Sequence, residues 1–97
     1  MNVSSSLSGM RAAELMLAVS ADNTANLDTP GYHAERADLT STSTGDVLAS
    51  LSRNPDEGVD LAQETATDIL GQFLYAANAR VIQARRDTEQ SLFDMLA

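Results

Sequence analysis

The sequence predicts an all-α protein in which two long terminal helices are joined by a loop. Apolar and small residues recur every three or four positions near both ends of the chain, and no alternating pair of strands stands out between them. The helices are expected to pair as a hairpin or within a multi-chain helical bundle. The predicted parts are an N-terminal helix and turn over 1–31, a linker over 32–58, and a C-terminal helix over 59–97.

The first helix is predicted from about Ser5 to Leu27. Its apolar surface is broad because two sets of positions lie side by side. The sets are Leu7, Met10, Ala13, Leu17 and Ala21, and then Ala12, Leu15, Met16 and Val19. Gly9 costs about 1 kcal/mol relative to alanine and indicates either close backbone contact or a frayed first turn. Pro30 ends the helix because it lacks an amide hydrogen, and Gly31 can take a positive φ in the turn.

The linker is poorly patterned. Residues 40–46 form a short polar tract, and residues 54–58 are typical of a turn. Residues 47–51 fit either one helical turn or a short strand, and the pattern does not decide between them. The linker is therefore predicted to be a loop, ordered or disordered in an isolated subunit.

The C-terminal helix has the clearest pattern. Asp60 is a good N-cap residue, and Gln63 completes a capping-box pattern. Gly71 is the one weak helix former in the pattern. The predicted buried face is Ala62, Ala66, Ile69, Phe73, Ala77, Val81, Ala84, Thr88, Leu92 and Met95. This helix would be about 55 Å long against about 35 Å for the first, so a hairpin leaves about 20 Å without a partner, to be resolved by fraying, by a bend or by other subunits.

Composition excludes several classes of function. The chain has 97 residues and a formal net charge of -8, which argues against binding to nucleic acid or to anionic membranes. With no cysteine, it has no disulfide and no thiolate metal site. The N-terminus lacks the pattern of a cleaved secretory signal, and no apolar stretch is long enough for direct membrane insertion. One small domain is expected, which oligomerisation would stabilise.

No residues with a catalytic logic are recognisable. The serines lack a His–Asp partner pattern, so nucleophilic catalysis is not expected. His33 is the single histidine, and a metal site there would depend on Glu35 and Asp38 alone, so a solvated loop residue is the better interpretation. We therefore predict a protein that is not an enzyme and that has no catalytic, cofactor-binding or metal-binding residues.

Both ends of the chain resemble one family. Leu7-Ser8-Gly9-Met10, Ala12-Ala13 and Val19-Ser20-Ala21-Asp22-Asn23-Thr24-Ala25-Asn26-Leu27-Asp28-Thr29-Pro30-Gly31-Tyr32 are similar to the N-terminal motif of flagellar rod, hook and hook-associated proteins. Val59-Asp60-Leu61-Ala62-Gln63-Glu64 and Tyr75-Ala76-Ala77-Asn78-Ala79-Arg80-Val81-Ile82-Gln83 resemble the C-terminal motif of that family. The two motifs occur in the family's order at opposite ends of the chain.

The chain departs from the family pattern in places. Thr24 stands where the family has Ile, and Asp28 where it usually has Asn. Gly71 and Phe73-Leu74 replace a more charged stretch. The segment between the motifs is short, whereas rod and hook proteins usually have a β-rich domain or a longer insert there. The chain could thus be a minimal rod-type subunit, a divergent paralogue or a form trimmed to its termini.

The resemblance implies a structural subunit of the bacterial flagellar axial structure, with the basal-body rod as the first choice. Such a subunit would leave the cell through flagellar type III export without signal cleavage and assemble in the periplasm-spanning rod. Its partners would be other axial proteins, copies of itself and the export machinery. The expected assembly residues are Leu7, Met10, Leu17, Asn23, Asn26, Pro30, Gly31, Ile69, Phe73, Tyr75, Asn78, Val81 and Leu92. The alternative is a soluble regulator or export factor that mimics the axial helices and stays in the cytoplasm.

Three polar features have both a structural and a functional interpretation. The residues from Asn23 to Gly31 are explained by a helix end and its turn, and the resemblance adds subunit contact or export recognition. Asn78 is either a satisfied surface group or a polar residue that sets the register between packed helices. The acids Asp60, Glu64 and Asp68 precede Arg80, Arg85 and Arg86, which indicates either a solvated face or complementary contact between axially displaced subunits.

Overall fold

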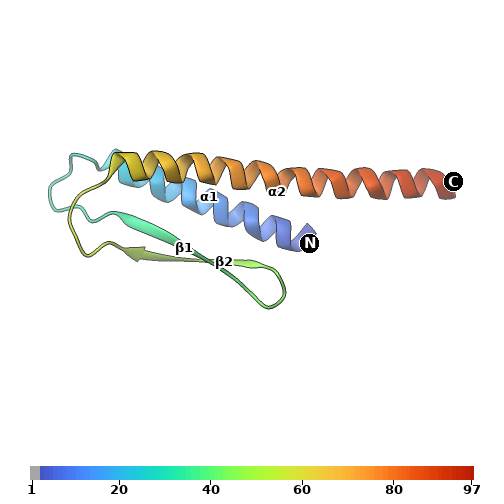
Figure 1. The fold of residues 1–97 in the computed structure, drawn as a ribbon, viewed down its shortest axis with the longest axis horizontal. Helices are drawn as coiled ribbons and strands as arrows, with labels where there is room; N and C mark the ends of the chain where they lie inside the picture. Colours follow the sequence, from blue (N-terminus) through green and yellow to red (C-terminus); the bar gives the residue numbers. More distant parts are fainter. Residues whose placement is uncertain (1–2) are drawn as a thin grey trace.

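The computed structural model describes residues 3–97 as two antiparallel helices and a β-hairpin. The order along the chain is α1 (Val3–Ala25), β1 (Glu35–Ser41), β2 (Val47–Arg53) and α2 (Leu61–Leu96). The molecule is elongated, with extents of 64 × 24 × 14 Å. α1 packs against α2 and against both strands, so it is the middle element (Figure 1). None of the helices over residues 3–97 contains a stretch long and apolar enough to cross a membrane.

The all-α prediction is wrong, because the linker forms a two-stranded antiparallel sheet. Its register runs from the pair Glu35 and Arg53 to the pair Ser41 and Val47. The polar tract makes the turn, where the Thr42 N–H donates to the Asp46 carbonyl at 2.8 Å and Gly45 takes a φ of +87°. Of the two alternatives for residues 47–51, the strand is correct. A two-stranded ribbon is marginal by itself, so the hairpin depends on α1.

The predicted ends of the helices are confirmed within two residues. The Asp60 side chain caps α2 by accepting from the amides of Ala62 and Gln63 at 3.1 and 3.3 Å. After α1, the Asn26 N–H donates to the Asp22 carbonyl at 3.1 Å, and Gly31 takes a φ of +73° in the following turn. The chain therefore reverses where Pro30 and Gly31 predicted.

The core is small and partly polar. Its buried apolar residues are Ala12, Ala13, Met16, Val19 and Ala34. Its buried polar residues are Ser5, Ser6, Ser20, Asn23 and Glu64. All except Ala34 and Glu64 belong to α1. With so little apolar area to bury, hydrogen bonds must specify much of the packing around α1.

The two helices approach closely at two glycines. A Cβ on Gly9 would lie 2.7 Å from Asn78 Nδ2, and a Cβ on Gly71 would lie 3.0 Å from Leu17 Cδ2. Of the two interpretations of Gly9, close backbone contact is therefore confirmed. Gly71, a weak helix former, is buried in the contact between the helices.

The face that α2 turns toward α1 is not the predicted buried face. It contains Glu64, Gly71, Leu74, Asn78 and Ile82, whereas Ile69 and Phe73 are 64% and 66% exposed. Residues Ile69 and Phe73 lie about 160° around the helix from Gly71. The helices approach closely at Gly71 and Asn78, which places this face against α1 and leaves Ile69 and Phe73 outside.

α2 extends well beyond α1. The helices have 36 and 23 residues, so about 20 Å of α2 runs past the start of α1. Residues 83–97 are exposed throughout, and α2 continues straight to its end (Figure 1). The prediction that about 20 Å of the C-terminal helix has no intramolecular partner is therefore confirmed. This part of α2 is a straight helix, neither frayed nor bent.

Candidate functional site

The site with the densest set of polar contacts is centred on Asn23, near the end of α1. Asn23 is 0% exposed. Its Nδ2 donates to the Glu35 carbonyl at 2.8 Å and to Glu64 Oε1 at 3.1 Å. Its Oδ1 accepts from the Glu35 N–H at 2.8 Å and from the Tyr32 hydroxyl at 3.1 Å. The amide side chain thus uses its two donors and both acceptor positions.

These contacts join four parts of the chain. Asn23 belongs to α1, Tyr32 to the following loop, Glu35 to β1 and Glu64 to the first turn of α2. We call Ser20 and these four residues the polar junction. It fixes the first strand and both helices relative to one another at a single point. No buried side-chain nitrogen or oxygen among residues 3–97 lacks a hydrogen-bond partner.

Glu64 is held in the polar junction rather than in solvent. It is only 8% exposed, and the Ser20 hydroxyl donates to its carbonyl at 2.9 Å. A buried carboxylate is costly unless it is hydrogen-bonded, and Asn23 supplies such a bond. The first turn of a helix also favours negative charge. Glu64 therefore docks α2 on α1 and is not part of a solvated acidic face.

A second group of contacts, most of them made by Arg53, lies beside the polar junction. The Arg53 guanidinium lies 5.7 Å from the centre of the Tyr32 ring and 3.3 Å from the Glu35 carboxylate. Its Nη1 also donates to the His33 carbonyl at 2.9 Å. The Gly58 N–H donates to the Tyr32 carbonyl at 2.9 Å, which connects the loop after β2 to the loop after α1. Tyr32 is therefore oriented by its ring, its hydroxyl and its backbone.

The far end of the hairpin is attached to α1 by serines. Ser8 Oγ accepts from the Val47 N–H at 3.0 Å and donates to the Ser5 carbonyl at 2.7 Å. Ser5 Oγ donates to Asp46 Oδ1 at 3.3 Å. The hairpin is thus held at its tip by Ser5 and Ser8 and at its base by Asn23. This explains why a pair of strands with weak hydrophobic patterning is ordered.

The predicted assembly residues fall into two groups. Asn23 is buried, and Met10, Leu17, Asn26 and Asn78 are half-buried at or near the helix contacts and the turn. The other group is exposed and consists of Leu7, Pro30, Gly31, Ile69, Phe73, Tyr75, Val81 and Leu92. The structure therefore buries or half-buries the three asparagines, with Asn78 beside Gly9 and Asn23 and Asn26 at the other end of α1, and leaves most of the apolar members on the surface.

Asn26 and Asn78 have local partners. Asn26 Nδ2 donates to the Asp22 carbonyl at 2.9 Å, and its Oδ1 accepts from Thr29 Oγ1 at 3.1 Å, which stabilises the turn after α1. Asn78 Nδ2 donates to the Leu74 carbonyl at 2.8 Å, while the side chain rests against Gly9. Of the two interpretations of Asn78, a satisfied polar group agrees with its bond to Leu74, and a role in helix register stays a prediction.

Sequence reasoning missed four functional members of this arrangement, namely Ser8, Ser20, Tyr32 and Glu64. Tyr32 and Glu64 each end one of the quoted motifs, which is a signal that could have paired them with Asn23. The serines carry no comparable signal, because their role depends on the hairpin beside α1. No group of three or more histidine, cysteine or acidic side chains is placed to hold a metal within residues 3–97. The hydrogen bonds of this arrangement hold the two helices and the hairpin in position.

Replacing Tyr32 with phenylalanine tests the polar junction with little change in shape. The variant is expected to be less stable by about 1 kcal/mol, because Asn23 Oδ1 loses one of its two donors. Urea unfolding followed by circular dichroism measures the loss. The matched control is Tyr75→Phe on α2, which should leave the midpoint unchanged. Equal midpoints for wild type and both variants would contradict the assigned role of the Tyr32 hydroxyl.

Comparison with known proteins agrees with the N-terminal motif. Residues 4–33 match the family model described as Flagella basal body rod protein. The matched segment contains all of α1 except Val3, the turn after it and Tyr32, and hence the part of the polar junction that precedes β1. The resemblance to the rod family is therefore confirmed over this segment. None of the curated proteins matches the chain.

Proposed function

We propose that the chain is a structural subunit of the rod that assembles by helix packing between subunits, because residues 4–33 match the family model described as Flagella basal body rod protein. Other axial proteins and further copies of the chain are its partners. It reaches the rod through the flagellar export machinery, without cleavage of a signal peptide. Its role is mechanical and involves no catalytic cycle.

The observation that carries this proposal is the apolar stripe on the outer side of α2. We define the α2 stripe as Ala62, Ala66, Ile69, Phe73 and Ala77. Ile69 and Phe73 are the large members, and both are mostly exposed. Contiguous exposed apolar surface on a soluble chain marks a place where another molecule binds. Alanines on either side of two large side chains allow a neighbouring helix to approach closely.

The fold itself cannot cover the α2 stripe. α1 packs on the opposite side of α2, and the hairpin packs on α1. Burial of Ile69 and Phe73 therefore requires a second molecule, and each would gain about 1.5–3 kcal/mol when fully buried. This gain is available only in an assembly, which is the behaviour expected of a subunit that polymerises.

Replacing Phe73 with glutamate separates assembly from folding. Phe73 is 66% exposed, so the thermal midpoint of the purified variant is expected to match that of wild type. A charge in the apolar contact between subunits should prevent incorporation into the rod. The measurement is the amount of tagged protein in purified hook–basal bodies relative to the soluble fraction.

The control for this experiment is Gln83→Glu, which adds the same charge to α2 away from the stripe. It should be incorporated like wild type. Normal incorporation of Phe73→Glu would rule out the stripe as an assembly surface. Recovery of the wild-type protein only in the cytoplasm would reject the structural role and favour the soluble regulator that mimics the axial helices.

A further inference from the structure

The outer face of each helix carries a row of exposed residues at coiled-coil spacing. In both rows the spacing alternates between four and three residues, which is the pattern of the a and d positions that pack in a coiled coil. We call the rows the α1 seam and the α2 seam, and all their members are exposed. The α1 seam is Leu7, Arg11, Glu14, Ala18, Ala21 and Ala25. The α2 seam is Ile69, Phe73, Ala76, Arg80, Gln83 and Asp87.

Neither seam has a partner within the described chain. The side of α1 that meets α2 contains Gly9 and Leu17, and the side that meets the hairpin contains Ser8 and Asn23, so the α1 seam is turned away from both. The α2 seam lies on the side of α2 opposite Gly71. The four charged members of the two seams make no ion pair or side-chain hydrogen bond among residues 3–97.

We infer that the α1 seam of one copy packs antiparallel on the α2 seam of the next copy. Copies in the same orientation place these helices antiparallel, as α1 and α2 are within one chain. Layers that pair an a position with a d position then match the seams member for member. The layers are Leu7 with Asp87, Arg11 with Gln83, Glu14 with Arg80, Ala18 with Ala76, Ala21 with Phe73, and Ala25 with Ile69. The inference rests on the proposed function and deepens it, because it names the surface of the neighbour that covers Ile69 and Phe73.

The sizes of the side chains agree with this register. Phe73 and Ile69 are 66% and 64% exposed in the single chain. In the proposed contact they meet Ala21 and Ala25 of the neighbouring copy. Large side chains on one helix opposite small ones on the other let two helices pack closely.

The charges select the same register. Glu14 shares a layer with Arg80 of the next copy. Arg11 leans toward the N-terminus of α1, as helical side chains do, and therefore toward Asp87 of the next copy. A shift of one heptad in either direction would place Glu14 opposite Asp87 or opposite Phe73. Asp22, at the edge of the α1 face, meets no acidic residue in the proposed register, because Ile69 and Phe73 lie nearest to it.

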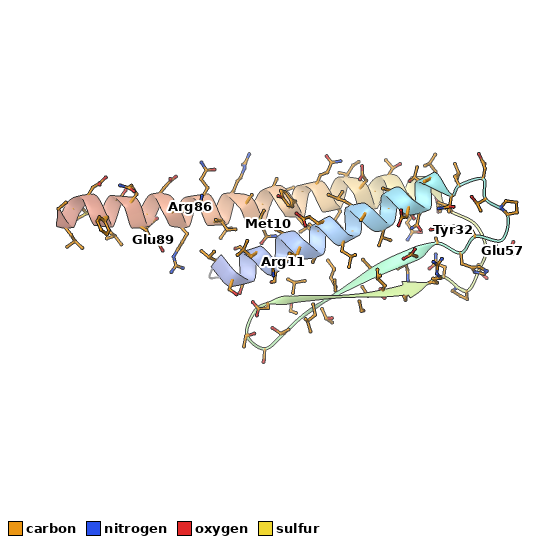
Figure 2. The ribbon with its side chains drawn as sticks, turned by 180° about the vertical axis from the view of Figure 1, so that it is seen from behind. Met10, Arg11, Tyr32, Glu57, Arg86 and Glu89 are labelled. Atoms are coloured by element: carbon orange, nitrogen blue, oxygen red, sulfur yellow. The ribbon has the colours of Figure 1, made fainter. Side chains whose placement is uncertain are left out.

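The contact displaces successive copies along the helices. Within one chain Gly9 lies against Asn78, so Leu7 is level with Arg80. Between copies Leu7 is level with Asp87, which is seven residues or about 10 Å farther along α2. A displaced contact between two different surfaces continues from copy to copy as an open helical array. Asp87 belongs to the part of α2 past α1, where Figure 2 shows Arg86 and Glu89, so a neighbour would also cover some of that length.

Only one of the charged residues singled out in the sequence takes part. Asp60 caps α2, and Glu64 is buried against Asn23. Asp68 accepts from the Gln72 side chain at 3.2 Å. Arg85 pairs with Glu89. Arg80 is left for a neighbouring copy, and its partner is an acid of α1.

The test uses engineered cysteines, because the natural chain has none. The full-length double variant Ala18→Cys and Ala76→Cys places both thiols in one layer of the contact. Within one molecule they lie on opposite outer faces of helices whose axes alone are about 8–10 Å apart, so a disulfide must join two molecules. Mild oxidation is expected to give a ladder of dimers, trimers and longer chains on non-reducing gels.

The matched control is the pair Ala25→Cys and Ala76→Cys, which is out of register by seven residues. Its thiols would be about 10 Å apart along the helices, beyond the reach of a disulfide, so no ladder is expected. Both pairs are studied in the purified protein and in purified hook–basal bodies. Equal ladders from the two pairs, or no ladder from the in-register pair in either preparation, would overturn the inference.

Charge exchange tests the register independently. In the in-register cysteine variant, Glu14→Arg should abolish the ladder, because two arginines would share a layer. Arg80→Glu should do the same with two acids. Both changes together should restore the ladder, and so should a mixture of the two single variants. Thermal midpoints should stay unchanged, because both side chains are exposed and unpaired within the chain. A ladder that survives Glu14→Arg, or one that the exchange does not restore, would contradict the proposed register.

The in-register pair in hook–basal bodies separates the two proposals. A ladder there supports both. Incorporation without a ladder overturns the seam contact and leaves the rod function standing. A ladder from the purified protein combined with absence from basal bodies supports the contact and rejects the rod function.

Discussion

Replacing Asn23 with leucine is expected to lower the free energy of unfolding by about 3–5 kcal/mol, the largest effect of any single substitution in the polar junction. Leucine has similar size but no polar atoms. The Glu35 N–H and carbonyl, the Glu64 carboxylate and the Tyr32 hydroxyl would all lose a partner at a site that is 0% exposed. Since small domains are stable by only about 5–15 kcal/mol, much of the variant should be unfolded at 37 °C.

Urea unfolding followed by circular dichroism measures this loss, and Asn26→Leu is the matched control. Asn26 makes its bonds in an exposed turn, where water can replace them, so its loss should stay below about 1.5 kcal/mol. Hydrogen exchange should also show faster exchange in β1 for Asn23→Leu. Losses of equal size in the two variants would mean that the polar junction does not organise the fold.

Replacing Gly71 with leucine should also destabilise the protein strongly, by about 3 kcal/mol. A Cβ at this position already lies 3.0 Å from Leu17 Cδ2 and 3.6 Å from the Ala13 carbonyl oxygen. The further atoms of leucine would force α1 and α2 apart. Separation would in turn lengthen the Asn23–Glu64 and Ser20–Glu64 bonds at the junction. The measurement is again the urea midpoint.

Two variants show whether the effect arises from the contact between the helices. Gly71→Ala should change stability by no more than about 1 kcal/mol, because better helix propensity offsets a tight contact with the movable Leu17 side chain. Ala66→Leu makes a similar change on the exposed face of α2 and should be nearly neutral. A Gly71→Leu variant as stable as Ala66→Leu would show that the helices are not closely packed at Gly71.

The sequence predicted the parts of the fold that local chemistry determines. The Asp60 cap and the reversal at Pro30 and Gly31 depend on groups within a few residues, and both are where they were expected. The N-terminal motif also predicted the family correctly over residues 4–33. These features need no knowledge of what packs against them.

The hairpin could not be predicted in the same way. Its inward positions in β1 are Glu35, Ala37 and Leu39, which give little hydrophobic alternation. Its order comes from bonds to Ser5, Ser8 and Asn23, which are remote in sequence. A pattern read along the chain cannot show that side chains of a helix will satisfy the backbone of a strand.

The face of α2 that packs on α1 could not be predicted from the sequence either. Hydrophobicity alone favours the face with Ile69 and Phe73, but α1 packs on the face with Glu64, Gly71 and Asn78. α1 packs on this face because Gly9 and Gly71 permit close approach of the two helices. The buried Glu64 carboxylate also accepts a hydrogen bond from Asn23 there. The role of Ile69 and Phe73, on the outer face, in contacts between subunits stays a prediction.

The small core described above has a thermodynamic consequence. Five apolar residues within residues 3–97 are buried, and four of the five have small or medium side chains. The heat-capacity change of unfolding grows with the apolar surface exposed and is reduced by polar surface, so it should be low for a chain of this length. A low heat-capacity change flattens the dependence of stability on temperature. The unfolding enthalpy of a chain of 97 residues is also small, and a small enthalpy broadens the thermal transition. The isolated subunit should therefore melt over a broad range, and a sharp transition should belong to the assembled polymer.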